Sequence, residues 1–296
     1  MFPEVPDFPK AIEVQTTAAC NACCIICPHA QVWKEGLRGT MADHLFEKII
    51  AECQKYQSDL RLIPYLNGEP FLDPNMPDKI AMINEQCPES VVEISTNVSM
   101  LDEKIISKLY YTRIDDLRLS IFGFSQQTHE KMMPGLKWER VWANLMRLIT
   151  DPRLRQQIPE INLVMIAHPY VPEEEYMQAQ EFCYQHGLKF KHWGFLDRSG
   201  NVKLFSNEVR HERVYGCEQH RPLERMHIRV NGDIILCCQD WRASTVIGNV
   251  AEMSLREIWL SPAYNKVRAS IYRGEGEVPE ICKKCKLALT GGALSQ

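Results

Sequence analysis

Short apolar runs alternate with longer amphipathic stretches over residues 1–205. A strand buried on both faces reads as a short continuous apolar run. We expect strands at 11–15, 60–66, 91–95, 117–121, 161–166 and 188–193. Between them, apolar residues recur at helical spacing, as Phe46, Ile49 and Ile50 do. We expect helices at 43–56, 77–85, 102–110, 138–148 and 173–185. Strands that alternate with helices indicate an α/β protein with a parallel sheet.

The expected elements make about six βα units, fewer than the eight of a closed TIM barrel. We therefore predict an open, partial (β/α)6 TIM-like barrel. Barrels of this kind carry their chemistry at the C-terminal ends of the strands. The loops that follow the expected strands are thus the first places in which to seek functional residues.

The pattern changes near residue 205, and a smaller α+β unit is expected over residues 206–296. The runs 226–230 and 233–237 flank Asn231-Gly232, which predicts a hairpin with a type I′ turn. A helix over 255–270 is expected to be interrupted near Ser261-Pro262. We therefore expect two domains, 1–205 and 206–296.

Composition narrows the class of protein. The chain has 296 residues and a net charge of −4, so it lacks the basic footprint of a nucleic-acid-binding protein or an anionic-membrane binder. It has no apolar stretch of about 18 residues and no signal peptide, so we expect a cytoplasmic protein with no membrane segment. Three of its twelve cysteines, Cys53, Cys87 and Cys183, stand apart and are expected to pack as small apolar side chains.

Cys20, Cys24 and Cys27 form a CxxxCxxC loop directly after the first expected strand. Three thiolates at this spacing can hold three irons of a 4Fe–4S cluster and leave the fourth iron open. The same cysteines could instead bind zinc with a fourth ligand such as His29. Cys23 breaks the register and is expected to fill space.

The CxxxCxxC loop resembles the defining motif of the radical S-adenosylmethionine (SAM) superfamily. The resemblance implies that the open iron binds SAM, and that an electron from the cluster cleaves SAM to methionine and a 5′-deoxyadenosyl radical. That radical abstracts a hydrogen atom from the substrate. It also implies an electron donor such as a flavodoxin or a ferredoxin.

The same resemblance suggests which residues contact SAM. Asn67-Gly68-Glu69-Pro70 is similar to the family's Gly-Gly-Glu-Pro, with Asn67 as a departure, and implies a contact to the SAM amino group. By family position, Ser95, Asn97 and Ser120 are expected at the ribose or carboxylate, and Arg198 at the carboxylate. Read from the residues alone, these are a polar turn, a strand-end turn and a surface arginine.

Cys217, Cys237, Cys282 and Cys285 form a second set, which on spacing alone also fits a zinc ribbon. This stretch resembles the SPASM domain in its shortened, single-cluster "twitch" form, and implies a second, auxiliary 4Fe–4S cluster. Cys238 follows Cys237 and, if both lie on a strand, points to the opposite face. It is expected either to be a small buried thiol or to return a hydrogen atom to a substrate radical.

The expected activity is that of a radical SAM oxidoreductase, a dehydrogenase acting on a sugar-like or aminocyclitol-like metabolite with the auxiliary cluster as electron acceptor. A radical epimerase with Cys238 as donor, a peptide-modifying maturase and a non-catalytic zinc or iron–sulfur scaffold are the alternatives. Because the first cluster cysteine is residue 20, no room is expected for an N-terminal peptide-recognition domain. That favours a small molecule over a peptide substrate.

Overall fold

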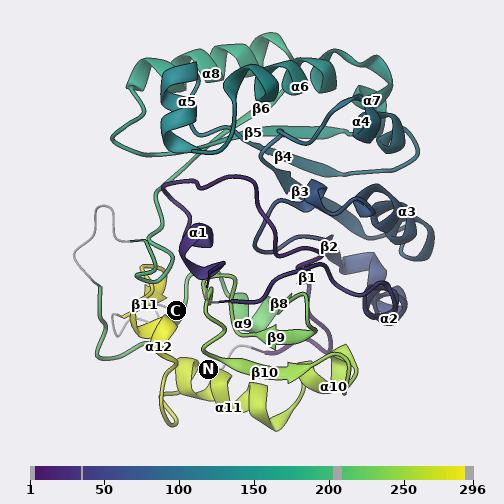
Figure 1. Ribbon diagram of the computed structural model, residues 1–296. Coiled ribbons are helices and arrows are strands. Elements are labelled where there is room, and N and C mark those ends of the chain that lie inside the picture. The colour runs from purple at the N-terminus through teal and green to yellow at the C-terminus, as the bar shows by residue number, and fades with distance from the viewer. Residues whose placement is uncertain (1–3, 35, 203–208, 291–296) are drawn as a thin grey trace.

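The computed structural model describes residues 4–34, 36–202 and 209–290, in which the main sheet has nine strands in the order β10-β9-β8-β1-β2-β3-β4-β5-β6 (Figure 1). The strands of its first part are β1 (Ala11–Val14), β2 (Arg61–Ile63), β3 (Val91–Thr96), β4 (Asp116–Ser120), β5 (Glu160–Ile166) and β6 (Lys189–Trp193). All six pair in parallel with their neighbours in sequence. The predicted partial barrel of six strands is therefore confirmed.

Helices connect these strands and cover the outer face of the sheet (Figure 1). They are α2 (Asp43–Cys53), α3 (Met76–Gln86), α4 (Glu103–Leu109), α5 (Gln126–Met132), α6 (Trp138–Thr150), α7 (Pro152–Gln157) and α8 (Glu173–Gln185), with α1 (His29–Val32) and the 3-10 turns η1 (Gln54–Asp59) and η2 (Pro70–Leu72) in loops. Apolar side chains of α2, such as Phe46 and Ile49, are fully buried against the sheet. Their removal from water drives the packing of the helix.

The C-terminal segment continues the same sheet on the other side of β1. β8 (Arg225–Ile228) pairs in parallel with β1, and β9 (Asp233–Ile235) and β10 (Val246–Asn249) follow in antiparallel order. A separate pair joins β7 (Gly216–Cys217) to β11 (Ala288–Leu289). The remaining helices are α9 (Arg221–Glu224), α10 (Leu255–Trp259), α11 (Pro262–Tyr272) and α12 (Glu280–Lys283). β1 therefore joins the partial barrel to the C-terminal segment.

Several local expectations were wrong or incomplete. β2 ends at Ile63 rather than 66, because Pro64 has no N–H to donate to a neighbouring strand. The hairpin between β8 and β9 is present, but Asn231 lacks a positive φ, so the turn is not type I′. Gly232 N–H donates to Arg229 O, and Gly232 has φ +86°, as in a three-residue loop with a bulge glycine.

The interior of the partial barrel contains charged residues instead of apolar layers alone. Glu93 on β3 is opposite Asp116 on β4, and both carboxylates bind guanidinium groups. Arg61 reaches Glu93 and Asp116 at 2.9 and 3.2 Å, and Arg118 reaches the same two at 2.5 and 2.7 Å. These ion pairs satisfy charges that the inward-facing strand positions bring out of bulk water.

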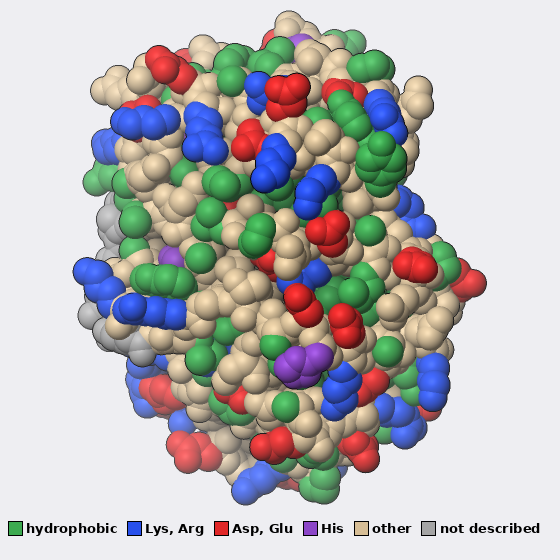
Figure 2. All heavy atoms as spheres, turned by 45° about the vertical axis from the view of Figure 1, so that its right-hand side comes forward, with side chains coloured by type: hydrophobic (Ala, Val, Ile, Leu, Met, Phe, Trp, Pro, Cys, Tyr) green, Lys and Arg blue, Asp and Glu red, His purple; other side chains and the backbone are tan. Residues whose placement is uncertain are grey.

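The outer surface is mixed in charge. On the face shown in Figure 2, acidic and basic side chains are interspersed over the helices. Within residues 4–34, 36–202 and 209–290, no helix combines the length and the apolar character needed to cross a membrane.

Candidate functional site

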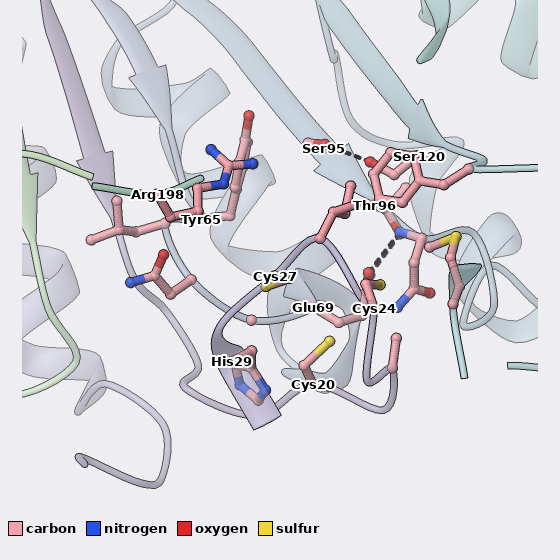
Figure 3. A pocket seen from close by; sticks show the side chains of 18 of the residues that line it. Cys20, Cys24, Cys27, His29, Tyr65, Glu69, Ser95, Thr96, Ser120 and Arg198 are labelled. Carbon is pink, nitrogen blue, oxygen red and sulfur yellow. Dashed lines mark hydrogen bonds between the residues drawn. The ribbon is translucent and has the colours of Figure 1, made fainter. Parts of the chain in front are cut away.

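The CxxxCxxC loop follows β1 and lines a cavity at the C-terminal ends of the first four strands (Figure 3). Cys20, Cys24 and Cys27 all face this cavity, whose volume is about 190 Å³. The exposed thiol of Cys23 is not one of its lining groups. The three predicted cluster cysteines are thus brought together on one side of a single cavity.

Backbone contacts hold the cysteine loop against the segment between α5 and α6. The Cys23 amide donates to Pro134 O at 2.6 Å, and the Ile25 amide donates to Met132 O at 3.0 Å. A Cβ atom on Gly135 would lie 2.7 Å from Asn21 O, so only glycine allows this approach. The loop is therefore positioned by backbone atoms of the chain and not only by what its thiols bind.

Gly68 brings the loop after β2 into direct contact with the segment that precedes Cys20. Its φ is +115°, and a Cβ atom there would lie 2.7 Å from Ala19 O and 2.8 Å from Thr17 O. The next amide, of Glu69, donates to Ala19 O at 2.8 Å. Glycine is needed here both for the backbone angle and for the close approach.

The Glu69 carboxylate joins this loop to the end of β3. It accepts hydrogen bonds from the Thr96 hydroxyl at 2.6 Å, the Asn97 amide at 2.7 Å and the Phe71 amide at 3.2 Å. Burial raises the pKa of Glu69 to about 7, although these three donors act in the opposite direction. Asn97 in turn donates to Asn21 Oδ1 at 2.9 Å, which connects β3 to the cysteine loop.

The other residues predicted to contact SAM line the same cavity, except for Pro70. Asn67, Ser95, Ser120 and Arg198 line the same cavity, and the hydroxyls of Ser95 and Ser120 are 3.4 Å apart (Figure 3). Pro70 does not line it in the described part of the chain, since it forms the first position of η2 and is buried. Its role there is to start that turn.

Arg198 differs from an ordinary surface arginine. Its backbone is left-handed, with φ +54°, and its Nε is buried without a hydrogen-bond partner among the described residues. Its positive charge lowers the pKa of the Cys27 thiol, although burial dominates and the net shift is upward. An unpaired, buried guanidinium nitrogen at the edge of this cavity is suited to a carboxylate.

The surroundings of the three thiols disfavour the thiolate form unless a cation is bound. Burial raises the pKa of Cys20 to about 12, and burial together with the neighbouring sulfurs raises the pKa of Cys24 and of Cys27. Soft sulfur donors in such surroundings suit an iron–sulfur cluster or zinc. His29, the alternative fourth ligand, has its Nε2 bonded to Ala18 O at 2.9 Å.

Sequence reasoning missed several residues of this cavity. Tyr65, which lies beyond the end of β2, donates its hydroxyl to Glu93 Oε1 at 2.9 Å. Trp241 reaches the cavity from the C-terminal segment and meets His29 edge to face, with 6.5 Å between the ring centres. The other unpredicted lining residues are Ala22, Ile26, Leu66, Thr96, Phe122 and Met133. Only tertiary packing brings Trp241 here.

The second cysteine set also forms one cluster in space. Cys217, Cys237, Cys282 and Cys285 line a small cavity of about 30 Å³. The β7–β11 pair brings Cys217 to the CxxC segment, because Ala288 is opposite Cys217. Burial, followed by the charges of the neighbouring sulfurs, raises the pKa of the Cys282 thiol above its usual range.

Hydrogen bonds to the second set favour thiolates. Amides of Gln239 and Leu287 point at the sulfurs of Cys237 and Cys285, each at 3.4 Å. Nη1 of Arg221 lies 3.8 Å from Cys237 Sγ. Backbone donors and a positive charge around four partly buried cysteines fit an iron–sulfur centre, whose potential such contacts adjust.

Cys238 does not line the cavity of that set, but not for the reason expected. β9 ends at Ile235, so Cys237 and Cys238 are not on a strand and strand alternation does not separate them. Their thiols are in hydrogen-bond contact, which is the main reason that the pKa of Cys238 is raised. Cys238 is partly exposed, and its sulfur lies within 4.8 Å of ligand atoms of Glu13 and His227.

Glu13 and His227 form a buried ion pair beside Cys238. Burial alone would raise the pKa of Glu13, but the charges of His227 and Arg225 outweigh it and bring it to about 2. Burial would lower the pKa of His227, but the Glu13 carboxylate outweighs it and raises it to about 9. Glu13, His227 and Cys238 also offer donors for a metal, but Arg221 and Arg225 place two positive charges there.

A larger cavity of about 530 Å³ adjoins both cysteine sites. It shares Ile26 and Arg198 with the cavity of the first set, and Arg221 and Leu287 with that of the second. Trp193, at the end of β6, is 42% exposed and forms part of its wall. The arrangement leaves room for a small ligand between the two cysteine sites.

Comparison with known proteins agrees with this geometry. The radical SAM superfamily matches residues 14–183, and the SPASM iron–sulfur cluster-binding domain matches residues 217–286. The S-adenosyl-L-methionine-dependent 2-deoxy-scyllo-inosamine dehydrogenase of Niallia circulans is 22% identical over 274 residues, which cover 93% of this chain and 91% of that protein. The two domains indicate SAM and 4Fe–4S clusters as cofactors, and the relative supports an oxidoreductase.

Solved structures share the fold. BtrN in complex with AdoMet and 2-DOIA has a TM-score of 0.62 and 20% identity over 94% of this chain and 93% of its own. Streptococcus suis SuiB bound to the precursor peptide SuiA has a TM-score of 0.74 and 15% identity over 98% of this chain and 72% of its own. The predictions of family, fold class and cofactors are confirmed: the chain belongs to the radical SAM superfamily and carries a C-terminal SPASM domain.

Proposed function

We propose that this enzyme oxidises an alcohol carbon of a small polar metabolite of the sugar or aminocyclitol type. One observation carries the proposal: the 530 Å³ cavity borders the first cysteine site on one side and the second on the other. A substrate held there is next to both redox centres. The dehydrogenase activity of the Niallia circulans relative supports the same reaction class.

The first site would be built by Cys20, Cys24 and Cys27, each holding one iron of a 4Fe–4S cluster. Gly68 and Glu69 offer the backbone against which the SAM amino group binds, and Arg198 offers an unpaired guanidinium nitrogen to its carboxylate. Ser95, Asn97 and Ser120 supply hydrogen-bonding groups for the ribose. When bound, SAM and its cluster supply hydrogen-atom abstraction from a C–H bond.

The second site would be built by Cys217, Cys237, Cys282 and Cys285 around an auxiliary 4Fe–4S cluster. The oxidation balances if the substrate carbon loses its hydrogen atom, the hydroxyl proton passes to water, and one electron passes to the auxiliary cluster. Arg221 stands between the cavity and Cys237, so it would stabilise the thiolates on the electron's path. A flavodoxin or a ferredoxin would reduce the first cluster.

Iron content and SAM cleavage test the site assignments. After anaerobic reconstitution we expect about eight irons per chain, four for each cluster. Cys24→Ala should lose about four irons and all release of 5′-deoxyadenosine. Cys282→Ala should also lose about four irons but still cleave SAM. Cys53→Ala, which removes a buried thiol of α2, should match the wild type in iron content and in release of 5′-deoxyadenosine. A colourless, zinc-loaded protein that leaves SAM intact would contradict the proposal.

A second candidate is epimerisation with Cys238 as hydrogen-atom donor. It is favoured by the position of the Cys238 sulfur, within 4.8 Å of a carboxylate oxygen of Glu13, which lines the larger cavity. Turnover in heavy water separates the two reactions. Solvent deuterium on a product carbon, lost in Cys238→Ala, indicates epimerisation; a Cys238→Ala enzyme that still forms ketone without deuterium indicates oxidation.

A peptide substrate is the remaining alternative. SuiB, which shares this fold, is bound to a precursor peptide in its structure. Incubating the reconstituted enzyme with short peptides and with aminocyclitols, and measuring 5′-deoxyadenosine release above the background without substrate, compares the two classes directly. Stimulation by peptides alone would exclude the metabolite proposal.

A further inference from the structure

Positively charged side chains outnumber negatively charged ones in the lining of the larger cavity. Four arginines line it, Arg118, Arg198, Arg221 and Arg225, and its carboxylate among the described residues is that of Glu13. Two of the arginines are accounted for by the cofactor sites, since Arg198 also borders the first cysteine site and Arg221 contacts Cys237. Arg118 and Arg225 remain for a substrate.

The carboxylates that pair with these two arginines are less exposed than the arginines themselves. Arg225 reaches Glu13 at 3.3 Å, and its side chain is 36% exposed while that of Glu13 is 10% exposed. The Arg118 side chain is 26% exposed, while its partners Glu93 and Asp116 are 4% and 11% exposed. In the lining of the cavity, guanidinium groups are therefore more accessible to a ligand than the Glu13 carboxylate, and Glu93 and Asp116 are not among the lining residues.

The lining of the cavity therefore carries a positive excess, because four guanidinium groups share it with one carboxylate among the described residues. Asp116 holds Nε and Nη2 of Arg118, and Glu93 contacts its Nη1. Arg225 contacts Glu13 through Nη1. Guanidinium groups bind carboxylate and phosphate in a planar, two-point geometry.

An aromatic side chain also lines the cavity, next to Arg118. The partly exposed Trp193 lies 5.7 Å from the Arg118 guanidinium, measured to the ring centre. An indole face next to a guanidinium suits a ring that carries a charged substituent, because the ring packs on the indole while its substituent reaches the arginine.

We propose that the substrate carries an anionic group, a phosphate or a carboxylate, bound by Arg118 and Arg225. This rests on the proposed function, because it names the substrate class of that reaction. It also separates this enzyme from its relative: the protonated amine of 2-deoxy-scyllo-inosamine would meet two like charges in this cavity.

Binding of small anions to the reconstituted enzyme, with SAM present, tests the proposal. The probes for isothermal titration calorimetry are inorganic phosphate, malonate and, as a cationic comparison, 2-deoxy-scyllo-inosamine. We expect phosphate or malonate to bind saturably at millimolar concentrations, and which of the two binds more tightly distinguishes phosphate from carboxylate. The amine is expected not to bind.

The variants isolate the two arginines. Combined Arg118→Gln and Arg225→Gln should weaken anion binding at least tenfold, whereas the two Lys replacements, which keep the charge, should retain most of it. Arg61→Gln is the matched control, because Arg61 pairs with the same Glu93 and Asp116 but does not line the cavity. It should change the dissociation constant less than twofold. Iron content and circular dichroism confirm that each variant is folded.

The outcomes separate this inference from the proposed function. Failure of both anions to bind, equal binding to the Gln variants, or tighter binding of the amine would overturn the anionic substrate. SAM cleavage without added substrate is measured on the same preparations. If SAM is cleaved and no anion binds, only the substrate class is wrong; if anions bind and SAM stays intact, the proposed reaction is wrong.

Discussion

Gly68→Ala tests whether the loop after β2 positions the cysteine loop. The new methyl group would lie 2.7 Å from Ala19 O and 2.8 Å from Thr17 O, closer than real Cβ atoms come to oxygen. Those carbonyls belong to the segment that leads into Cys20. To relieve the contact, either the loop after β2 or the cysteine loop must move, and both line the same cavity.

The free-energy cost of Gly68→Ala has two parts. A residue other than glycine at φ +115° costs about 1–3 kcal/mol. The steric overlap adds about 1–3 kcal/mol, as overpacking of a rigid site does. Gly39→Ala separates the two parts, because Gly39 has φ +95° but no atom within 4 Å of its would-be Cβ. Gly39→Ala should therefore show the backbone cost alone.

Thermal unfolding and SAM binding measure the two effects. Since about 1 kcal/mol shifts the midpoint by roughly 2 °C in a chain of this size, Gly39→Ala should unfold about 2–6 °C lower and Gly68→Ala a further 2–6 °C lower. SAM affinity of the reconstituted enzyme should fall about tenfold or more in Gly68→Ala, for about 1.4 kcal/mol lost, and stay unchanged in Gly39→Ala. Equal midpoints and equal SAM affinity in the two variants would refute the reasoning.

Two further predictions concern stability. The folded-state pKa of Glu69, about 7, lies above its unfolded value of about 4.5, so the native state binds the extra proton between these values. The unfolding midpoint of the cluster-free protein should fall as pH rises from about 4.5 to 7, and Glu69→Gln should flatten that slope; an unchanged slope would contradict the assignment. Arg268 is buried between Trp259 and Tyr264 and donates to Trp259 O at 2.7 Å. Arg268→Gln should destabilise the C-terminal segment by about 2–4 kcal/mol, against less than about 1 kcal/mol for the exposed Arg256→Gln, as measured by chemical denaturation.

The parallel strands could be predicted from short, mainly apolar runs such as that of β5, which is buried along most of its length, although Glu93 and Arg118 interrupt the runs of β3 and β4. The interruption near Ser261-Pro262 could also be predicted from the sequence. In the structure α10 ends at Trp259, and the Ser261 hydroxyl accepts a hydrogen bond from the Tyr264 amide at the start of α11. The short helices α5 and α7 were missed, since each has too few residues to show a periodic pattern. Both helices have an N-cap residue of a preferred type, Ser125 for α5 and Asp151 for α7, and these residues could have indicated where the helices begin.

Other features depend on contacts that no local pattern records. The hairpin after β8 was predicted, but its parallel pairing with β1 follows from tertiary structure. The position of Trp241 in the first cavity has the same origin. The strand-alternation argument for Cys238 was wrong because two residues of strand were assumed where β9 has already ended. Sequence spacing identified the cysteine sets, but not what surrounds them.

The opening of the barrel explains why the larger cavity is charged. A closed barrel fills its interior with layers of apolar side chains, whereas here the first six strands leave the interior open to the C-terminal segment. Inward-facing positions such as Glu93, Asp116 and Arg118 then adjoin a cavity, and their charges must be paired to remain there. In the pairs that Arg118 forms with Glu93 and Asp116, the arginine lines the cavity and the carboxylates do not. The ion pairs inside the open barrel thus also set the charge on the wall of the larger cavity.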